Sequence, residues 1–266
     1  MPEFHQPRKR FGQHFLADPT ILQQIVHIIA PGPGQHLLEI GPGQGVLTLR
    51  LAGAVAQLDA VELDRDLIAP LQRACAAFGN VRIHQADALK FSPRSLLASA
   101  DQPLRKLRVV GNLPYNISTP LLFHLFESID IIEDMHFLLQ KEVVDRICAA
   151  PGSGSYGRLS VMTQYYCHSS SMLVVPPQAF KPPPKVDSAV VRMIPHARPP
   201  VAVDDIAAFS AFVAQAFSAR RKTLRNVLKA QLSREDFEQA QIDSQRRAET
   251  LSLQEFASLF QCHRGA

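Results

Sequence analysis

The sequence predicts an α/β fold, a doubly wound sheet with helices on both faces, followed by a small all-α domain. Between residues 36 and 150, short apolar strands alternate with amphipathic helical segments, which is typical of sheets built from strand–helix–strand units. From Asp204 onward, the apolar residues recur at helical spacing. We therefore divide the 266 residues into a first domain over 1–200 and a helical domain over 201–266.

The composition is that of a globular protein and argues against several classes. The chain is 46% hydrophobic and 20% charged, which is enough to bury a full core. No apolar stretch approaches the roughly 20 residues of a membrane span, and the chain starts without a signal-peptide core, so we expect a cytosolic protein with no membrane partner. The four cysteines include no C-x-x-C pair, which argues against disulfides and a metal site. A net charge of +4 permits a nucleic-acid partner without requiring one.

The N-terminal region combines a basic triplet with the first expected helix. Arg8-Lys9-Arg10 fits either a solvated tail or an arm that contacts phosphate groups. Asp18 and Pro19 fit the N-cap and the first residue of a helix with one apolar face, and Pro31 ends it. Spacing alone assigns no role to His14.

A glycine-rich turn follows the first buried strand, residues 36–40. The turn, Gly41-Pro42-Gly43-Gln44-Gly45, lets a ligand approach the backbone closely, but it is tighter than the Gly-x-Gly-x-x-Gly turn of dinucleotide enzymes. The next two strands end at Glu62 and near Asp87, each of which alone fits a helix cap or a surface acid. One glycine turn and two acids at successive strand ends together indicate an adenosine site, with Glu62 on the ribose. No second half with its own glycine turn follows, which argues against a full dinucleotide.

The fourth buried strand ends in a short polar and aromatic loop. Asn112 offers an amide oxygen, Pro114 stiffens the turn and has no N–H, and Tyr115 offers an aromatic face. At the carboxyl end of a strand, such a set suits a flat molecule with an exocyclic amine, which means a nucleobase. Thr119-Pro120 is expected to begin the next helix.

The rest of the first domain contains further strands and a proline-rich connection over residues 176–186. Within that connection, Phe180 either points outward over the sheet edge, held by polyproline stiffness, or packs against the sheet. The expected elements are a strand over 135–140, a helix from Lys141, a helix over 159–167, and strands over 171–175 and 188–194.

The C-terminal domain carries the densest basic cluster of the chain. Helical spacing puts Lys222, Arg225 and Lys229 on one face, beside Arg220 and Arg221. Such a cluster fits either a solvated face or a contact with phosphate, and we favour phosphate. Capping boxes are expected at Ser233-x-x-Asp236 and Ser252-x-x-Glu255.

Six motifs together resemble the bacterial 16S ribosomal RNA adenine N6,N6-dimethyltransferases, the kasugamycin-sensitivity enzyme family. The resemblance spans nearly the whole chain and implies a Rossmann-like class I methyltransferase sheet. It also implies S-adenosyl-L-methionine as methyl donor, S-adenosyl-L-homocysteine as product, and no metal. The motifs are Phe11 to Leu16, Glu39 to Gly43, Gly111 to Tyr115, Gln140 to Val143, Tyr156 to Ser160, and Phe180 to Ser188.

The resemblance also assigns roles at the donor site. The residues are His14 and Leu16, which close over the donor, Gly41 at its amino-acid end, Glu62 at the ribose, Asp87 at the adenine, and Asn112 between donor and target.

The expected chemistry is methyl transfer to N6 of adenine, whose lone pair is delocalised into the ring. Hydrogen-bond acceptors that draw the N–H bonds toward tetrahedral geometry make this nitrogen a nucleophile, and we expect Asn112 Oδ1 and the Leu113 carbonyl to do so. Tyr115 and Phe180 are expected to stack the extruded base from two sides. Pro114 completes the expected catalytic set.

The resulting hypothesis is a monomeric enzyme that dimethylates two adjacent adenosines near the 3′ end of 16S rRNA in the small ribosomal subunit during assembly. Two alternatives remain open: a 23S rRNA adenine methyltransferase of the macrolide-resistance type, and a mainly non-catalytic assembly factor. The residues expected to bind RNA are Arg8, Lys9, Arg10, Arg221, Lys222 and Arg225.

Overall fold

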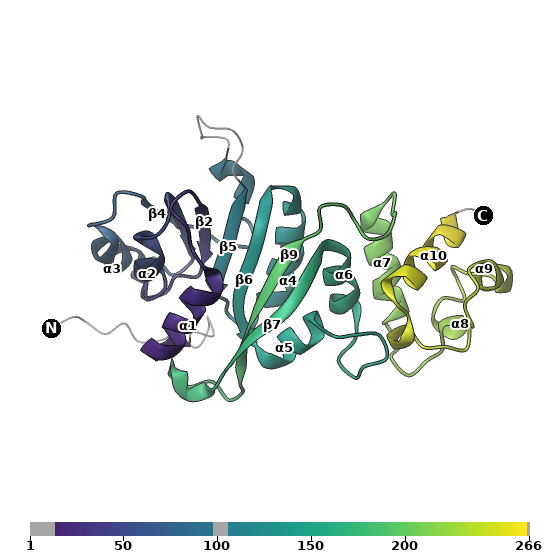
Figure 1. Cartoon of the computed structure of the whole chain (residues 1–266). Helices are drawn as coiled ribbons and strands as arrows, with labels where there is room; N and C mark the ends of the chain where they lie inside the picture. The colour runs from purple at the N-terminus through teal and green to yellow at the C-terminus, as the bar shows by residue number, and fades with distance from the viewer. Residues whose placement is uncertain (1–13, 98–105, 265–266) are drawn as a thin grey trace. The chain divides into compact units, whose positions relative to one another are not determined.

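The computed structural model describes residues 14–97 and 106–264 (Figure 1). The basic triplet Arg8-Lys9-Arg10 lies outside the described residues. Contacts divide the chain into two compact units, one formed by residues up to 144 with 170–195, the other by residues 145–169 with those from 196 on. The helical segment 159–167, which the sequence analysis assigned to the first domain, thus groups with the C-terminal helices.

The first unit is organised by a seven-stranded sheet with strand order β4-β3-β2-β5-β6-β9-β7 (Figure 1). Strands β4, β3, β2, β5 and β6 are parallel, and β9 is antiparallel to β6. The predicted α/β sheet with surrounding helices is therefore confirmed. The strands of this sheet are β2 (His36–Ile40), β3 (Gln57–Glu62), β4 (Val81–Gln85), β5 (Leu107–Asn112), β6 (Ile132–Gln140), β7 (Cys167–Val175) and β9 (Ser188–Pro195).

A separate two-stranded sheet joins β1 (Phe15–Leu16) to β8 (Phe180–Lys181). Its antiparallel register pairs Leu16 with Phe180, and the main-chain N–H groups of Ala17 and Asp18 donate to the Ala179 carbonyl. The start of the described chain is thus tied to the proline-rich connection. The helices associated with the large sheet are α1 (Pro19–Ile29), α2 (Thr48–Ala52), α3 (Arg65–Cys75), α4 (Ser118–Phe126) and α5 (Lys141–Ile147).

Helix α1 has the boundaries that its sequence predicts. The Asp18 carboxylate accepts hydrogen bonds from the Thr20 and Ile21 N–H groups, and Ala30 ends the helix in a left-handed conformation. Its apolar face packs into a core with residues from β2, β5, β6 and β9. The buried Arg108 of β5 donates to the carbonyls of Ile29 and Ala30, so the C-terminal end of α1 is fixed to the sheet.

Helix α4 begins one residue before Thr119, with Ile117 rather than Thr119 at its N-cap. The predicted start at Thr119-Pro120 is wrong because the preceding turn leads directly into the helix: the Ile117 N–H donates to the Pro114 carbonyl, and the Leu121 N–H to the Ile117 carbonyl. Pro120 fits within the first turn, since the N–H groups there have no partner within the helix.

The second unit is helical, as predicted for the C-terminal region. An aromatic cluster forms its interior, in which Phe209 contacts Tyr165 and Phe260. Both capping boxes are confirmed, since the side chains of Ser233 and Ser252 accept from the N–H groups three residues later. The helices are α6 (Arg158–Tyr166), α7 (Ile206–Ala216), α8 (Leu224–Val227), α9 (Arg234–Gln239) and α10 (Leu253–Arg264), with short 3₁₀ turns in the chain at Pro93–Leu96, Ile129–Ile131, Pro177–Ala179 and Ala248–Thr250. Among the described helices, none has the length and apolar character needed to cross a membrane.

Candidate active site

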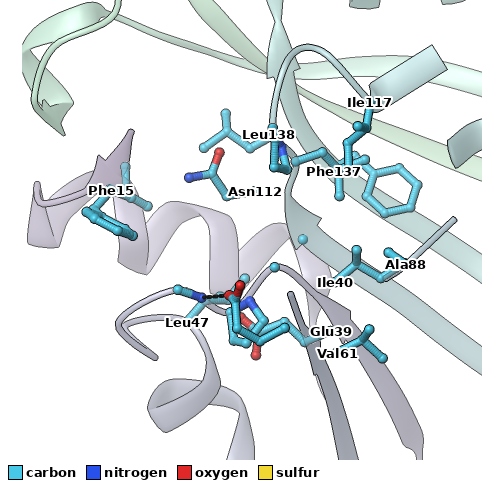
Figure 2. Close-up of a pocket in the computed structure, with 18 of the residues that line it drawn as sticks. Phe15, Glu39, Ile40, Leu47, Val61, Ala88, Asn112, Ile117, Phe137 and Leu138 are labelled. Carbon is cyan, nitrogen blue, oxygen red and sulfur yellow. Dashed lines mark hydrogen bonds between the residues drawn. The ribbon is translucent and has the colours of Figure 1, made fainter. Parts of the chain in front are cut away.

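A cavity lies at the carboxyl ends of the parallel strands (Figure 2). It brings together most of the residues that the sequence singled out. Two of the expected residues, Tyr115 and Phe180, do not line it. The expected residues that do are His14, Leu16, Gly41, Glu62, Asp87, Asn112, Leu113 and Pro114.

The glycine turn after β2 forms one wall of this cavity. Gly41 and Gly43 adopt positive φ angles of 68° and 58°, which side chains disfavour. A Cβ on Gly43 would also lie 2.9 Å from the Phe15 ring. The turn therefore presents bare backbone to the cavity, as the sequence predicts for close approach of a ligand.

The Glu62 carboxylate at the end of β3 is held by the backbone of two loops. Its Oε2 accepts from the Gly43 N–H at 3.1 Å, and its Oε1 accepts from the Asp64 N–H at 2.8 Å. Burial raises the pKa of Glu62, partly offset by these two hydrogen bonds. Each carboxylate oxygen keeps a second lone pair, so both can still accept a hydroxyl of a ligand.

Asp87 follows β4 in a turn that its own atoms close. Its Oδ1 accepts from the Leu89 N–H at 3.0 Å, and its carbonyl accepts from the Phe91 N–H at 2.9 Å. The Phe91 ring packs on His84, whose Nε2 lies 2.6 Å from a carboxylate oxygen of the buried Asp59. The turn that carries Asp87 is thus fixed from both ends.

Asn112 ends β5 and directs its side chain into the cavity (Figure 2). Its Nδ2 donates to the His14 carbonyl at 3.0 Å. Because a carbonyl only accepts, this bond fixes the amide so that Oδ1 is the atom available to a ligand N–H. Gly111 before it cannot be replaced without movement, since a Cβ there would lie 2.4 Å from the Ile40 carbonyl oxygen.

Tyr115 is half-buried beside the cavity. Its ring stacks on the His14 imidazole with a centroid distance of 5.6 Å and an interplanar angle of 24°. Its hydroxyl forms a 2.9 Å hydrogen bond with Ser188 Oγ, and burial raises the pKa of the phenol. Both contacts hold the ring in one orientation.

The sequence left two positions open for the Phe180 ring, outward over the sheet edge or packed against the sheet, and the structure has the packed one. The side chain is only 2% exposed and packs in the core with Leu16 and Ala179. The outward position is wrong because the pairing of β1 with β8 turns this side chain inward, which proline stiffness in the flanking chain does not oppose.

The sequence analysis missed two buried polar residues that line the cavity, Glu39 and His136. Glu39 is 2% exposed, its Oε2 has no hydrogen-bond partner, and burial raises its pKa to about 7. His136 is 3% exposed, neither ring nitrogen has a hydrogen-bond partner, and burial lowers its pKa to about 4. The sequence does contain a signal for both residues, because each is an ionisable residue between apolar neighbours in a buried strand.

The basic cluster of the second unit is exposed but does not share one helical face. Helix α8 spans only Leu224–Val227, so Lys222 precedes it and Lys229 follows it. That prediction is wrong because the hydrogen-bonded helix is a single turn. Arg220 is engaged by the Gly154 carbonyl and Glu249, whereas Arg221, Lys222 and Arg225 are exposed. Among the described residues, no group of three or more His, Cys, Asp or Glu side chains could hold a metal ion.

Comparison with known proteins identifies the family. The family described as "Ribosomal RNA adenine dimethylase" matches residues 4–264. The chain belongs to this family. The "Ribosomal RNA small subunit methyltransferase A" of Methylococcus capsulatus is 55% identical over 255 residues, which cover 96% of this chain and 97% of that protein. The protein of the same name from Pseudomonas aeruginosa is 53% identical, covering 96% and 94%.

Two solved structures have the same fold. A dimethyladenosine transferase from Plasmodium falciparum superposes with a TM-score of 0.78, at 24% identity, covering 92% of this chain and 96% of the other. The 23S rRNA methyltransferase ErmE superposes with a TM-score of 0.70, at 25% identity, covering 94% and 99%. The family resemblance and the class I methyltransferase fold predicted from the sequence are therefore confirmed.

The chain is accordingly an rRNA adenine dimethyltransferase that uses S-adenosylmethionine. The residues around the cavity fit this donor. The carboxylates of Glu62 and Asp87 lie at or just after the ends of the adjacent strands β3 and β4, and the bare backbone of the glycine turn lies between them and β5. The Oε2 of Glu39 is buried in the cavity wall and has no hydrogen-bond partner. A negatively charged lining suits a sulfonium, which is a cation.

Proposed function

We propose that this enzyme dimethylates N6 of two adjacent adenosines near the 3′ end of 16S rRNA, in the small ribosomal subunit and during its assembly. The observation that carries the proposal is Asn112, whose amide nitrogen is held by the His14 carbonyl while its side chain lines the cavity. The names of the related proteins from Methylococcus and Pseudomonas support the small subunit as the substrate. We further propose that it acts as a monomer in the cytoplasm.

In this proposal, residues at the ends of β2, β3 and β4 would hold the donor. Gly41 lets its amino-acid end approach the backbone, Glu62 accepts from the ribose hydroxyls, and Asp87 accepts from the adenine amine. His14 and Leu16 close over it from β1 and the residue before it. The donor supplies an electrophilic methyl group on its sulfonium.

The residues of the loop after β5 prepare the target nitrogen. Asn112 Oδ1 and the Leu113 carbonyl accept hydrogen bonds from the two N–H groups of N6, which localises the lone pair on the nitrogen. The N–C bond forms as the C–S bond breaks, and the proton that N6 then sheds passes to solvent. Pro114 keeps the loop in place. In this proposal, positioning of the target nitrogen and electrostatic stabilisation supply most of the rate enhancement of methyl transfer.

Tyr115 is the proposed stacking platform for the extruded base, and its hydrogen bond to Ser188 holds the platform still. Phe180, whose ring is buried and does not line the cavity, is proposed to act from behind it, by packing with Leu16, which does line it.

The exposed Arg221, Lys222 and Arg225 of the second unit are proposed to contact RNA phosphates, together with the triplet Arg8-Lys9-Arg10. Such contacts position the enzyme on its RNA without reading sequence.

Methylation of purified ribosomal subunits tests the proposal. With labelled donor, undermethylated small subunits should become labelled and large subunits should not, and a reverse-transcription stop should locate the modified adenines near the 3′ end. Unlabelled small subunits would overturn the proposal. Label on 23S rRNA would instead support the activity named for the structural relative ErmE.

A further inference from the structure

One side chain at the mouth of the active site connects three parts of it. His14 Nδ1 lies 2.8 Å from the Pro182 carbonyl, its own carbonyl accepts from Asn112 Nδ2, and its ring stacks on Tyr115. His14 lines the cavity, whereas Tyr115 does not. The imidazole therefore covers one face of the Tyr115 ring, and the residue that carries it lines the cavity.

The imidazole makes the kinds of contact that a target adenine would need there. It is a flat ring stacked on Tyr115. Because the Pro182 carbonyl can only accept, Nδ1 carries a hydrogen and donates it to a backbone oxygen. An adenine stacked on the same face would likewise donate its N–H bonds to backbone and amide oxygens.

We propose that the His14 ring is a placeholder: without substrate it occupies the face of Tyr115 that the target base takes, and it must swing aside when the base enters. This inference rests on the stacking role proposed for Tyr115. It assigns to the His14 side chain a part in base entry that is separate from donor binding.

The local geometry allows the ring to leave without disturbing the catalytic amide. The bond that holds Asn112 uses the main-chain carbonyl of His14, and rotation about χ1 moves only the side chain. One hydrogen bond, at an exposed position, ties the ring to Pro182. Among the described residues, the base therefore competes with one ring contact and one hydrogen bond.

Three substitutions separate the ring from its hydrogen bond. His14→Ala removes both, His14→Asn keeps a side-chain N–H donor but removes the ring, and His14→Phe keeps a ring but cannot bond to Pro182. Methylation of undermethylated small subunits is measured at saturating donor, and donor affinity is measured separately by calorimetry. The KM for subunits should fall about three- to tenfold in the Ala and Asn variants, the size expected for one ring contact. The Phe variant should have a higher KM for subunits than the Ala and Asn variants, because its ring still covers the face of Tyr115.

The outcomes are distinct. A KM for subunits that rises in the Ala and Asn variants would show that the ring supports the base rather than standing in its place, which overturns the inference. The inference is also overturned if the KM for subunits falls in the Phe variant, which has lost the hydrogen bond to Pro182, and is unchanged in the Asn variant, which keeps a side-chain donor. Thermal melting identifies a variant that fails to fold, and the Asn variant then carries the test. If the wild type itself does not methylate small subunits, the proposed function fails, which the His14 series cannot mimic.

Discussion

One face of the central sheet carries two rows of buried ionisable residues that are treated in opposite ways. The register places Arg108 beside Asp134, and two residues further along each strand it places Glu39 and His136 on either side of Val110. Arg108 and Asp134 form two hydrogen bonds of 2.8 Å, and Arg108 also binds the end of α1. In the second row, Glu39 Oε2 and both ring nitrogens of His136 have no hydrogen-bond partner, and His136 Nδ1 lies 3.7 Å from Asp134 Oδ1. The paired row stabilises the fold, and the unpaired row marks where a ligand is expected.

Breaking the paired row should have the largest effect. Arg108→Met leaves the buried Asp134 carboxylate and two helix carbonyls without their donor, so we expect the free energy of unfolding to fall by about 3–5 kcal/mol. Urea denaturation measures it. Arg192→Met is the matched control, since Arg192 reaches the same carboxylate only at 4.0 Å and its side chain is 42% exposed. Equal losses in the two variants would contradict the assignment of Arg108 as the anchor.

The catalytic amide should show the reverse pattern, with activity lost and stability kept. Asn112→Ala removes an acceptor of the target amine, and we expect methylation to slow by about 10²–10³-fold, as for loss of one transition-state hydrogen bond. Subunit binding should persist, which separates catalysis from a pure assembly role. Asn116→Ala is the control, because Asn116 lines the same cavity from the same loop but is exposed. Loss of subunit binding together with activity would contradict this separation.

The unpaired row, Glu39 and His136, predicts two pH dependences of stability that oppose each other. Glu39 has a folded pKa of about 7 against an ordinary value of 4.5, so it binds more protons when the protein is folded. Its contribution to the free energy of unfolding therefore falls as pH rises between these values. His136 has a folded pKa of about 4 against 6.5, so its contribution rises with pH over that window. The two slopes oppose each other between 4.5 and 6.5 and should largely cancel.

Single substitutions should expose each slope. Without ligand, His136→Phe should leave a protein whose unfolding free energy falls from pH 4.5 to 7, by up to about 3 kcal/mol, since one pKa unit corresponds to about 1.4 kcal/mol. Glu39→Gln should leave the opposite slope. Chemical denaturation across this range measures both. The exposed Glu133→Gln on β6 is the control, and parallel profiles for all variants would show that the two buried groups do not titrate as stated.

The same contrast explains what the sequence could predict. Strand ends that carry Gly41, Glu62, Asp87 and Asn112 follow from apolar runs broken by polar residues, which is local information. The inward turn of the Phe180 ring depends on pairing with β1, which lies more than 160 residues away in the chain. No local pattern encodes such a pairing. The single turn of α8 was missed for a related reason, because the Leu224 and Arg225 N–H groups bond instead to carbonyls of a later loop.

The exposed basic cluster should give the smallest effect per residue. Surface cations that contact phosphate release counterions, so replacing Arg221, Lys222 and Arg225 by Ala should weaken subunit binding and reduce the salt slope by about one unit for each lost contact. Donor affinity should not change, because these side chains belong to the second unit. Arg234→Ala, which removes an exposed arginine paired with Glu238, is the control and should leave the slope as it was. If the triple variant keeps the wild-type slope, the phosphate contacts lie elsewhere, and the exposed cluster is only a solvated face.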